Sequence, residues 1–512
     1  MRLLSVVLVI VLSTAVAAFA AGKAEHVVVV VWDGMRPDFV NETNTPTLSQ
    51  LAREGVFFQN HHAVYLCSTE VNATAMATGC YPNRNGILGN HEYRPQINPL
   101  TNVAVEAFAT VRKGDELTHN HYLQLPTLAE ILQRAGKRTA IASTKPVALL
   151  DDRLEQGRTC ADCVNLFEHT TVPAAALKKL DLPSFTPKDT PNTRQDEVAT
   201  HALIGPMWDM ALPAFSLLWL SEPDNTQHNS GLGSAKSLKA LKSSDDNLAR
   251  VLQELTARGV RDKTDVFVIS DHGFSTISRT VDVAALLKNA GIEAAGVFKQ
   301  PPIDGNVMVV PNGGSALLYV IGHDSRLIHK IVELLQTRDF TGAIFTREPM
   351  EGTFTFDQVR INTSDAPDIA FSFRWTTDEN IAGIAGSVAS DGGNGVGRGI
   401  HTSLSPFDVH NTLIAAGPDF RKGMVDQFPS GNIDLAPTIL HILGVPPPER
   451  MDGRVLTEAL AAETLKPSAP STHTLEATHD LGNTFWHQYL RVTEFDGTTY
   501  FDEGNGHQEP KK

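Results

Sequence analysis

The sequence is short of cysteine, of aromatic residues and of positive charge. Only 4 of its 512 residues are cysteine, 7% are aromatic, and 43 Lys and Arg face 58 Asp and Glu, which gives a formal net charge of −15. Bulk nucleic acid and anionic membranes require a basic face, so neither is expected as a partner. A small anionic substrate stays compatible with this charge, because bound metal ions can outweigh the net charge locally.

The scarce cysteines bear on metal binding and on the cellular compartment. Cys160-Ala-Asp-Cys163 fits a local disulfide or half of a zinc knuckle, but no second C-x-x-C motif exists to complete a knuckle. A small, even number of cysteines suggests disulfides in an oxidising compartment. A bridge between Cys67 and Cys80 also stays open.

A single stretch of the sequence is long and apolar enough to be a targeting segment. Arg2, the apolar run from Leu3 to Val16 and the cleavage motif Ala18-Phe19-Ala20 predict a signal peptide over residues 1–20. An uncleaved anchor helix is the alternative, although Ser13 and Thr14 dilute a run that is already short for a span. We therefore expect an exported protein, periplasmic or extracellular, with no stable membrane span in the mature chain.

Apolar runs alternate with helical patterns along most of the chain. Runs rich in β-branched residues fit strands that are covered on both faces; they are 26–32, 139–142, 215–220, 266–269 and 412–415. Helical patterns with end signals lie at 46–54, 127–136, 237–258 and 434–443. This alternation predicts an α/β fold with a doubly wound, mostly parallel sheet sandwiched by helices.

Two regions break the alternation. Residues 275–390 contain their own strand and helix signals and are interpreted as an inserted α+β cap subdomain, which leaves 21–274 and 391–465 as the catalytic core. The glycine- and serine-rich stretch 381–399 is predicted to be a mobile loop. Residues 466–512 are interpreted as a linker and a C-terminal β-hairpin, whose Asp496-Gly497 pair favours a type I′ turn.

Metal-ligand residue types follow the ends of three predicted strands. They are Asp33 after the first strand, Asp224 with His228 after the third, and Asp271 with His272 after the fourth, while His401 follows the glycine-rich stretch. Each motif alone is typical of a solvated loop or a core hydrogen bond. Because sites in open α/β sheets form at the carboxyl ends of strands, the six side chains are expected to converge. Three Asp and three His suit two zinc ions with three ligands each, with manganese or iron as alternatives.

A candidate nucleophile lies in the segment that begins at Cys67. Thr69 is placed to open a helix that runs to Thr78, and a hydroxyl beside a zinc ion is readily deprotonated. A helix N-terminus also favours a phosphate anion. A simple N-cap role for Thr69 is compatible with this interpretation.

Taken together, these motifs resemble the alkaline phosphatase superfamily, and most closely its type I phosphodiesterase/nucleotide pyrophosphatase branch. The resemblance covers about residues 26–460. The matching segments are Val31-Trp-Asp33-Gly, Thr69-x-x-Asn72 with Thr78-Gly79-x-Tyr81-Pro82, Glu222-Pro-Asp224-x-x-x-His228, Ser270-Asp271-His272-Gly273, Gly399-Ile-His401 and Asp434 to Gly444.

The resemblance implies a role for each matched position. Thr69 would be the nucleophile that forms a covalent phospho-threonine and would also touch the metals. Asp33, Asp271 and His272 would bind one zinc, and Asp224, His228 and His401 the other. Asn90 would donate to a non-bridging phosphoryl oxygen. The implied activity is hydrolysis of a small phosphorylated substrate, either a phosphodiester or a nucleotide pyrophosphate.

Several alternatives are weighed against this activity. Cys80-Tyr-Pro-Asn-Arg84 matches a sulfatase signature, but the register relative to Thr78-Gly79 places Thr69 at the nucleophile position. Lys145 lies where phosphomonoesterase and phosphonate hydrolase relatives carry a phosphate clamp, so either activity is an alternative; Lys145 could equally be a solvated surface lysine. Those relatives have a second basic residue where this chain has Val147, which favours diesters. A non-catalytic binding protein is the remaining alternative.

Overall fold

The computed structural model describes residues 22–155, 160, 162–183, 188–209, 212–463 and 468–511. The predicted signal peptide and part of the predicted linker lie outside the described residues. No helix in the described part of the chain has both the length and the apolarity needed to cross a bilayer.

A nine-stranded, mostly parallel sheet forms the centre of the molecule. Its order is β21-β2-β20-β9-β1-β8-β5-β6-β7. The five strands in its middle are mutually parallel: β9 (Thr264–Ile269), β1 (His26–Trp32), β8 (Phe215–Leu220), β5 (Thr139–Ser143) and β6 (Val164–Phe167). The outer strands are β21 (Met424–Gly431), β2 (Val56–His62), β20 (Leu413–Ala416) and β7 (Thr170–Val172).

Strand β1 shows why the sheet needs helices on both faces. Val27, Val29 and Val31 pack into one hydrophobic cluster, whereas Val28, Val30 and Trp32 pack into another. Because successive side chains point to opposite faces of a strand, an unbroken apolar run can be buried only between two layers. The predicted doubly wound α/β architecture is therefore confirmed.

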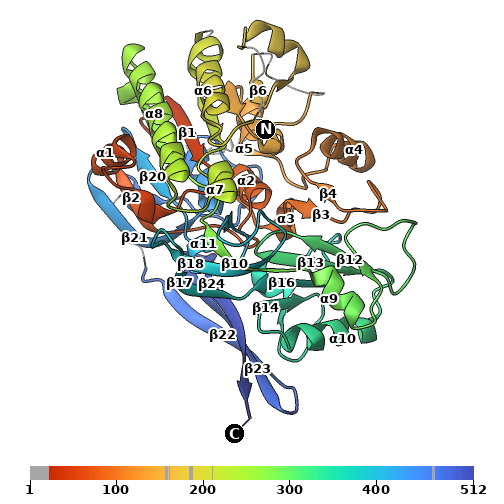
Figure 1. Cartoon of the computed structure of the whole chain (residues 1–512). Helices are drawn as coiled ribbons and strands as arrows, with labels where there is room; N and C mark the ends of the chain where they lie inside the picture. The colour runs from red at the N-terminus through yellow and green to blue at the C-terminus, as the bar shows by residue number, and fades with distance from the viewer. Residues whose placement is uncertain are drawn as a thin grey trace, which may run out of the picture.

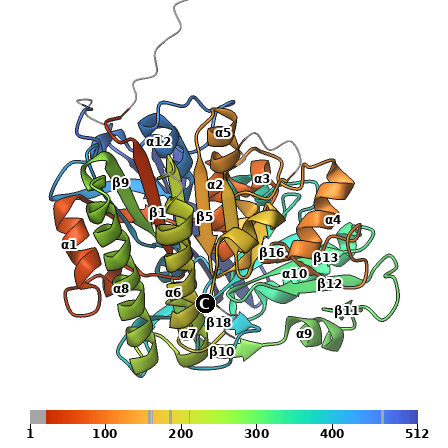
Figure 2. The ribbon, with the colours of Figure 1, turned by 90° about the horizontal axis from the view of Figure 1, so that it is seen from above.

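Helices cover each face of the sheet (Figure 2). One layer contains α2 (Thr69–Thr78), α5 (Leu128–Arg134) and α12 (Leu435–Ile442), which contact one another. The other contains α1 (Pro46–Glu54), α6 (Thr193–Ala202) and α8 (Ala235–Ala257). The capping box predicted at Thr127 is present, since its hydroxyl accepts from the Glu130 N–H and the Glu130 carboxylate accepts from the Thr127 N–H.

Two local predictions are corrected. The predicted strand around 412–415 is β20, which runs antiparallel to both β2 and β9; an apolar run carries no information about strand direction. The stretch 381–399, predicted to be a loop, contains β18 (Ala385–Asp391), whose middle residues are buried. Pairing with β10 (Ser275–Val281) and β17 (Trp375–Glu379) overrides the local preference of its glycines and serines.

Residues 275–390 hold a six-stranded sheet of order β11-β12-β13-β16-β14-β15 and most of a four-stranded sheet of order β17-β18-β10-β19. The short strands β11 (Ala294–Ala295) and β15 (Phe354–Thr355) form the edges of the larger sheet. The larger sheet contains β12 (Val307–Pro311), β13 (Ser315–Val320), β14 (Thr341–Thr346) and β16 (Ile369–Phe373), and helices α9 (Val283–Asn289) and α10 (Ser325–Gln336) accompany it (Figure 1). Strand β19 (Gly399–Ile400) comes from the second core segment and pairs with β10. The division into core and cap stays a proposal.

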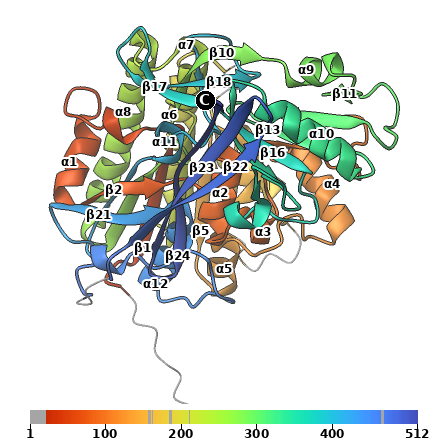
Figure 3. The ribbon, with the colours of Figure 1, turned by 90° about the horizontal axis from the view of Figure 1, so that it is seen from below.

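The C-terminal region is larger than the predicted hairpin. Strands β23 (Thr484–Phe495) and β24 (Thr498–Pro510) form that hairpin, and both Asp496 and Gly497 have positive φ, at 49° and 80°. A third strand, β22 (Ser471–Asp480), pairs with β23. The three strands form a long ribbon that crosses the underside of the molecule (Figure 3).

Trp486 anchors this ribbon. Its side chain is fully buried in the cluster formed by residues of the 275–390 region, and its Nε1 donates to the Gly352 carbonyl at 3.0 Å. We expect Trp486→Ala to lower the free energy of unfolding by about 3–5 kcal/mol, the usual cost of emptying a large aromatic site. Chemical denaturation checks this value, with the exposed Phe485→Ala as the control. An equal effect of both variants would contradict the anchoring role.

The cysteines divide into two kinds. Cys160 and Cys163 form a disulfide, which settles the choice against a zinc knuckle. Cys67 and Cys80 are buried and free, so the bridge between them is not present.

Candidate active site

Four neighbouring strands of the central sheet end at one place. Asp33 directly follows β1, Asp271 and His272 follow β9, Asp224 lies four residues after β8, and Lys145 lies two residues after β5. Since these strands are adjacent and parallel, their carboxyl ends share one edge of the sheet. The side chains that the sequence predicted to converge are therefore brought together.

Two groups of side chains within the described residues have the geometry of a metal site. Asp224, His228 and His401 form one, with ligand atoms all within 4.8 Å of one another. Asp33, Asp224 and His272 form the other. Asp271 was predicted for the second group; its carboxylate lies 3.2 Å from His272 Nε2. Asp224 thus lies between the two groups, and all six predicted ligands belong to one cluster.

The cluster has the polarity that a cation requires. Asp33 Oδ1, Asp224 Oδ1 and Asp271 Oδ2 are buried and have no hydrogen-bond partner in the part of the chain that the structure describes. Asp224 Oδ1 lies 3.1 Å from His228 Nε2, and Asp271 Oδ2 lies 3.2 Å from His272 Nε2. Burial, together with the neighbouring Asp271, raises the pKa of Asp33 to about 8, and burial raises the pKa of Asp271 to about 6. Buried carboxylates left without partners are costly, and divalent cations would satisfy them. The donor set of carboxylates and imidazoles, without thiolates, fits zinc and also fits manganese or iron.

Backbone carbonyls orient the three histidines. His272 Nδ1 lies 2.9 Å from the Gly273 carbonyl oxygen. His228 Nδ1 lies 3.0 Å from the Gly399 carbonyl oxygen, and His401 Nδ1 lies 3.0 Å from the Cys67 carbonyl oxygen. An Nδ1–H that donates to a carbonyl leaves Nε2 as the free lone pair, which is the usual arrangement of a metal-ligating histidine. Burial lowers the pKa of His272 and His401, which favours the neutral, ligating form.

Thr69 is the first residue of α2, directly after the N-cap residue Ser68. Its hydroxyl oxygen lies 3.2 Å from His272 Nε2, so the hydroxyl faces the ligand cluster. Asn72 fixes this turn: its Oδ1 accepts from the Val64 N–H at 2.8 Å, and its Nδ2 donates to the Ser68 carbonyl at 3.1 Å. The helix ends at Gly79, which has φ 66°. The predicted helix over 69–78 is confirmed.

Asn90 lies beside the first turn of α2. Its Oδ1 accepts from the Glu70 N–H at 3.3 Å, which orients the amide with its Nδ2 as the remaining donor. This arrangement is compatible with donation to a phosphoryl oxygen. Asn85, by contrast, has a structural role, because its side chain bridges the Cys80 carbonyl and the Ile87 N–H within a turn.

Lys145 belongs to the ligand cluster. Its ammonium lies 2.8 Å from Asp33 Oδ2 and 3.0 Å from Asp224 Oδ2, and its side chain is 17% exposed. Burial alone would lower its pKa, but the neighbouring carboxylates of Asp224, Asp33 and Asp271 raise it well above its usual value. The solvated-lysine interpretation is therefore wrong. Val147 is fully buried among apolar residues and offers no second cation.

A polar cavity of about 490 Å³ opens beside Lys145. It is lined by Glu106, Thr144, Lys145, Pro146, Glu168, His169, Thr170, Lys188, Asn192, Gln195 and Ser221. Its position next to the ligand cluster makes it a candidate for holding part of a substrate.

Two contributions to the site were not predicted. Trp219 Nε1 donates to Asp33 Oδ2 at 2.7 Å, and Glu106 reaches the cavity from the turn before α4 (Phe108–Thr118). Trp219 is the penultimate residue of β8, and this position near the carboxyl end of the strand is the feature of the sequence that places it close to the site. Near Glu106, the side chain of Phe108 is 47% exposed and stacks on Phe167 with ring centroids 6.3 Å apart.

Comparisons with known proteins give one consistent result. The sequence profile of the family described as type I phosphodiesterase / nucleotide pyrophosphatase matches residues 27–368. The mouse bis(5'-adenosyl)-triphosphatase enpp4 is 22% identical over 432 residues, covering 83% of this chain and 79% of the relative. Venom phosphodiesterase CdcPDE of Crotalus durissus collilineatus is 25% identical over 253 residues, and the match covers 48% of this chain but 26% of the venom enzyme.

Solved structures agree on the fold. Murine ectonucleotide pyrophosphatase / phosphodiesterase 5, in an inactive threonine-to-alanine variant in complex with AMP, aligns with a TM-score of 0.62 at 17% identity. The alignment covers 85% of this chain and 100% of that chain. The human counterpart aligns with a TM-score of 0.59 at 16% identity.

Proposed function

Because the chain belongs to the type I phosphodiesterase/nucleotide pyrophosphatase family, we propose that it is a two-metal hydrolase that cleaves phosphodiesters or nucleotide pyrophosphates through a phospho-threonine. The observation that carries the proposal is the placement of the Thr69 hydroxyl, at the start of α2 and 3.2 Å from His272, beside two groups of candidate metal ligands. The relatives named as triphosphatase and phosphodiesterase support nucleotide-type substrates.

Asp33, Asp271 and His272 would hold one metal ion, and Asp224, His228 and His401 the other. When bound, two zinc ions would supply positive charge that stabilises the phosphoryl oxygens and lowers the pKa of a nearby hydroxyl. Manganese or iron would supply the same chemistry. The unpartnered carboxylate oxygens of this cluster support the assignment of ions to it.

The first half of the reaction uses Thr69. Its Oγ1 loses a proton and attacks phosphorus, a new oxygen–phosphorus bond forms, and the bond to the leaving alcohol or phosphate breaks with inversion. Asn90 Nδ2 donates to a non-bridging oxygen, whose charge grows in the transition state. The N-terminus of α2 stabilises the same anion through its free N–H groups.

The second half regenerates the enzyme. Water attacks phosphorus from the side that the leaving group vacated, and the bond to Thr69 Oγ1 breaks with a second inversion. The product is a phosphate monoester, and the threonine hydroxyl regains its proton. In this scheme Lys145, held between Asp33 and Asp224, orients the metal-binding carboxylates and faces the phosphoryl group.

Lys145 is the cation that contacts the cluster, and the lack of a second basic residue at position 147 favours diesters over monoesters. A terminal phosphate carries two charges and needs more cationic contact than a diester does, and the apolar side chain of Val147 cannot provide it. The cavity beside Lys145 has room for the second substituent of a diester.

We expect the zinc-loaded protein to hydrolyse bis-p-nitrophenyl phosphate at least about tenfold more efficiently than p-nitrophenyl phosphate, the factor set by roughly one lost charge-assisted contact. Paired kcat/KM measurements check this. Monoester preference would overturn the diester assignment and favour a phosphomonoesterase or phosphonate hydrolase that uses Lys145 as its clamp. In that case Lys145→Ala should abolish the monoester activity, whereas the control Lys178→Ala, which removes an exposed lysine elsewhere, should keep it.

Export fits the proposed function. The ectonucleotidase and venom names of the relatives, the predicted signal peptide and the Cys160–Cys163 disulfide all support a periplasmic or extracellular location. An N-terminal sequence of the secreted protein that begins near residue 21 would agree with cleavage, and retention of residue 1 would favour the anchor.

A further inference from the structure

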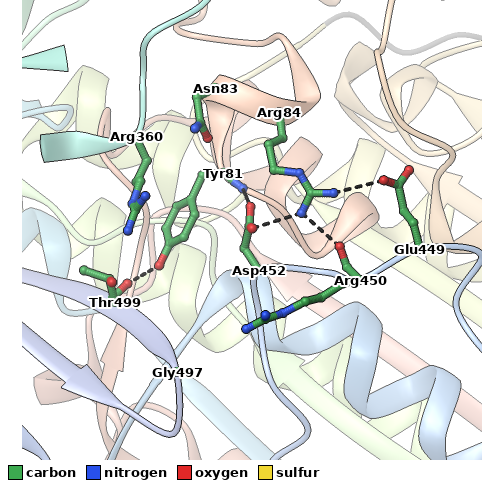
Figure 4. Close-up of a pocket in the computed structure, with 9 residues that line it drawn as sticks. All are labelled: Tyr81, Asn83, Arg84, Arg360, Glu449, Arg450, Asp452, Gly497 and Thr499. Carbon is green, nitrogen blue, oxygen red and sulfur yellow. Dashed lines mark hydrogen bonds and ion pairs between the residues drawn. The ribbon is translucent and has the colours of Figure 1, made fainter. Parts of the chain in front are cut away.

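A second group of cations lies at the other end of the helix that carries Thr69. A cavity of about 500 Å³ is enclosed by the turn at α3 (Pro82–Asn85), Arg360, residues 449–452 and the β23–β24 turn (Figure 4). Tyr81, in its wall, follows the C-terminal end of α2, whereas Thr69 begins that helix. Ten helical residues span about 15 Å, so this cavity is distinct from the metal cluster.

One arginine of the cavity, Arg84, makes hydrogen bonds and ion pairs with neighbouring protein groups. Arg84 donates to Asp452 Oδ1 at 2.9 Å, to the Arg450 carbonyl at 2.9 Å and to Glu449 Oε2 at 3.1 Å. The second Asp452 oxygen accepts from the Tyr81 N–H at 3.1 Å. These contacts neutralise much of the negative charge of the two carboxylates and hold the floor of the cavity in place.

Two other arginines have no such partner. Within the described chain, neither the Arg360 nor the Arg450 guanidinium makes an ion pair or a side-chain hydrogen bond, and both residues are exposed (Figure 4). The backbone of Arg360 is held in place, because its carbonyl accepts from the Asn83 N–H at 2.8 Å and its φ is 59°. Three guanidinium groups therefore face two carboxylates in a chain whose net charge is −15.

We propose that this cavity is a binding site for a small organic phosphate such as a sugar phosphate, separate from the candidate catalytic centre. The phosphate lies against Arg360 and Arg450, whose planar forks match phosphate oxygens. The volume of the cavity accommodates a molecule of this size.

The test uses glucose 6-phosphate as the probe and isothermal titration of the metal-loaded full chain. We expect binding that Arg360→Ala/Arg450→Ala weakens by about tenfold or more, since each charged hydrogen bond contributes roughly 1.5–3 kcal/mol. Arg326→Ala/Arg374→Ala, which removes two exposed arginines elsewhere, should leave this binding unchanged. Asp33→Asn should also leave it unchanged, which separates this binding from any at the metal centre.

Two further outcomes decide the proposal. Arg360→Ala/Arg450→Ala should keep the wild-type turnover of bis-p-nitrophenyl phosphate, which shows that the variant is folded. Absence of binding, or binding that only Asp33→Asn removes, overturns the proposal.

Discussion

Thr69→Ala is expected to lower turnover of bis-p-nitrophenyl phosphate by at least about a thousandfold. Without the nucleophile, the site retains only substrate binding and electrostatic stabilisation of the transition state. The variant should fold normally, since alanine fits the first turn of α2 and loses only the contact with His272. Steady-state kinetics and a thermal unfolding curve measured on the same preparation check both expectations.

Thr74→Ala is the matched control for this experiment. Thr74 lies in the same helix, is equally buried and donates to the Glu70 carbonyl at 2.8 Å, away from the ligand cluster. It should keep most of the activity. Denatured samples quenched during turnover should carry a p-nitrophenyl phosphoryl group on Thr69 in the wild type and none in Thr69→Ala. Turnover retained by Thr69→Ala would refute the covalent mechanism.

Removal of metal by exhaustive chelation should abolish activity, and added zinc should restore it. One buried carboxylate oxygen of each of Asp33, Asp224 and Asp271 has no hydrogen-bond partner among the described residues. Lys145 contacts only the other oxygens of Asp33 and Asp224. Asp33→Asn should lower zinc content and turnover together. Asp426→Asn, which changes a buried carboxylate of β21, should change neither. Full activity after chelation would contradict the metal assignment.

The pH dependence of zinc binding follows from the same carboxylates. In the metal-free protein the pKa of Asp33 is raised to about 8, so this group is protonated at neutral pH and must release its proton when a cation binds. Affinity should therefore fall as the pH is lowered from 8 towards 6, by about tenfold per unit for one displaced proton. The lowered pKa of His272 and His401 means that these ligands stay neutral over that range and add no steeper slope. Calorimetry in buffers of different ionisation enthalpy measures the proton release.

The sequence carried enough information to place the catalytic cluster. Asp33, Asp224 and Asp271 follow apolar runs, and the rule that parallel strands end together predicted that they meet. The histidines were found by the same argument, except His401, whose position depends on β19 and its pairing with β10. The sequence analysis placed His401 in the ligand set because of its position after the glycine-rich stretch, and the resemblance added which metal it would bind.

Other features depended on contacts that no local pattern records. Lys145 could not be distinguished from a surface lysine, because its burial results from β5 lying next to β8 and from carboxylates on other strands. Strand β18 was missed because its glycines and serines favour a loop until β10 and β17 pair with it. Strand β22 was missed because its polar residues are mostly exposed and show little apolar alternation.

The distances along the chain between contacting groups of the catalytic cluster bear on when the protein becomes active. His401 Nδ1 meets the carbonyl of Cys67 across 334 positions, and Thr69 meets His272 across 203. No chain that ends before residue 401 can contain the complete centre, and closing such long loops comes late in folding. A precursor threaded through a membrane in extended form would therefore acquire its metals only at its destination. Metal supply outside the cytoplasm, rather than the rate of synthesis, would then set how much active enzyme accumulates.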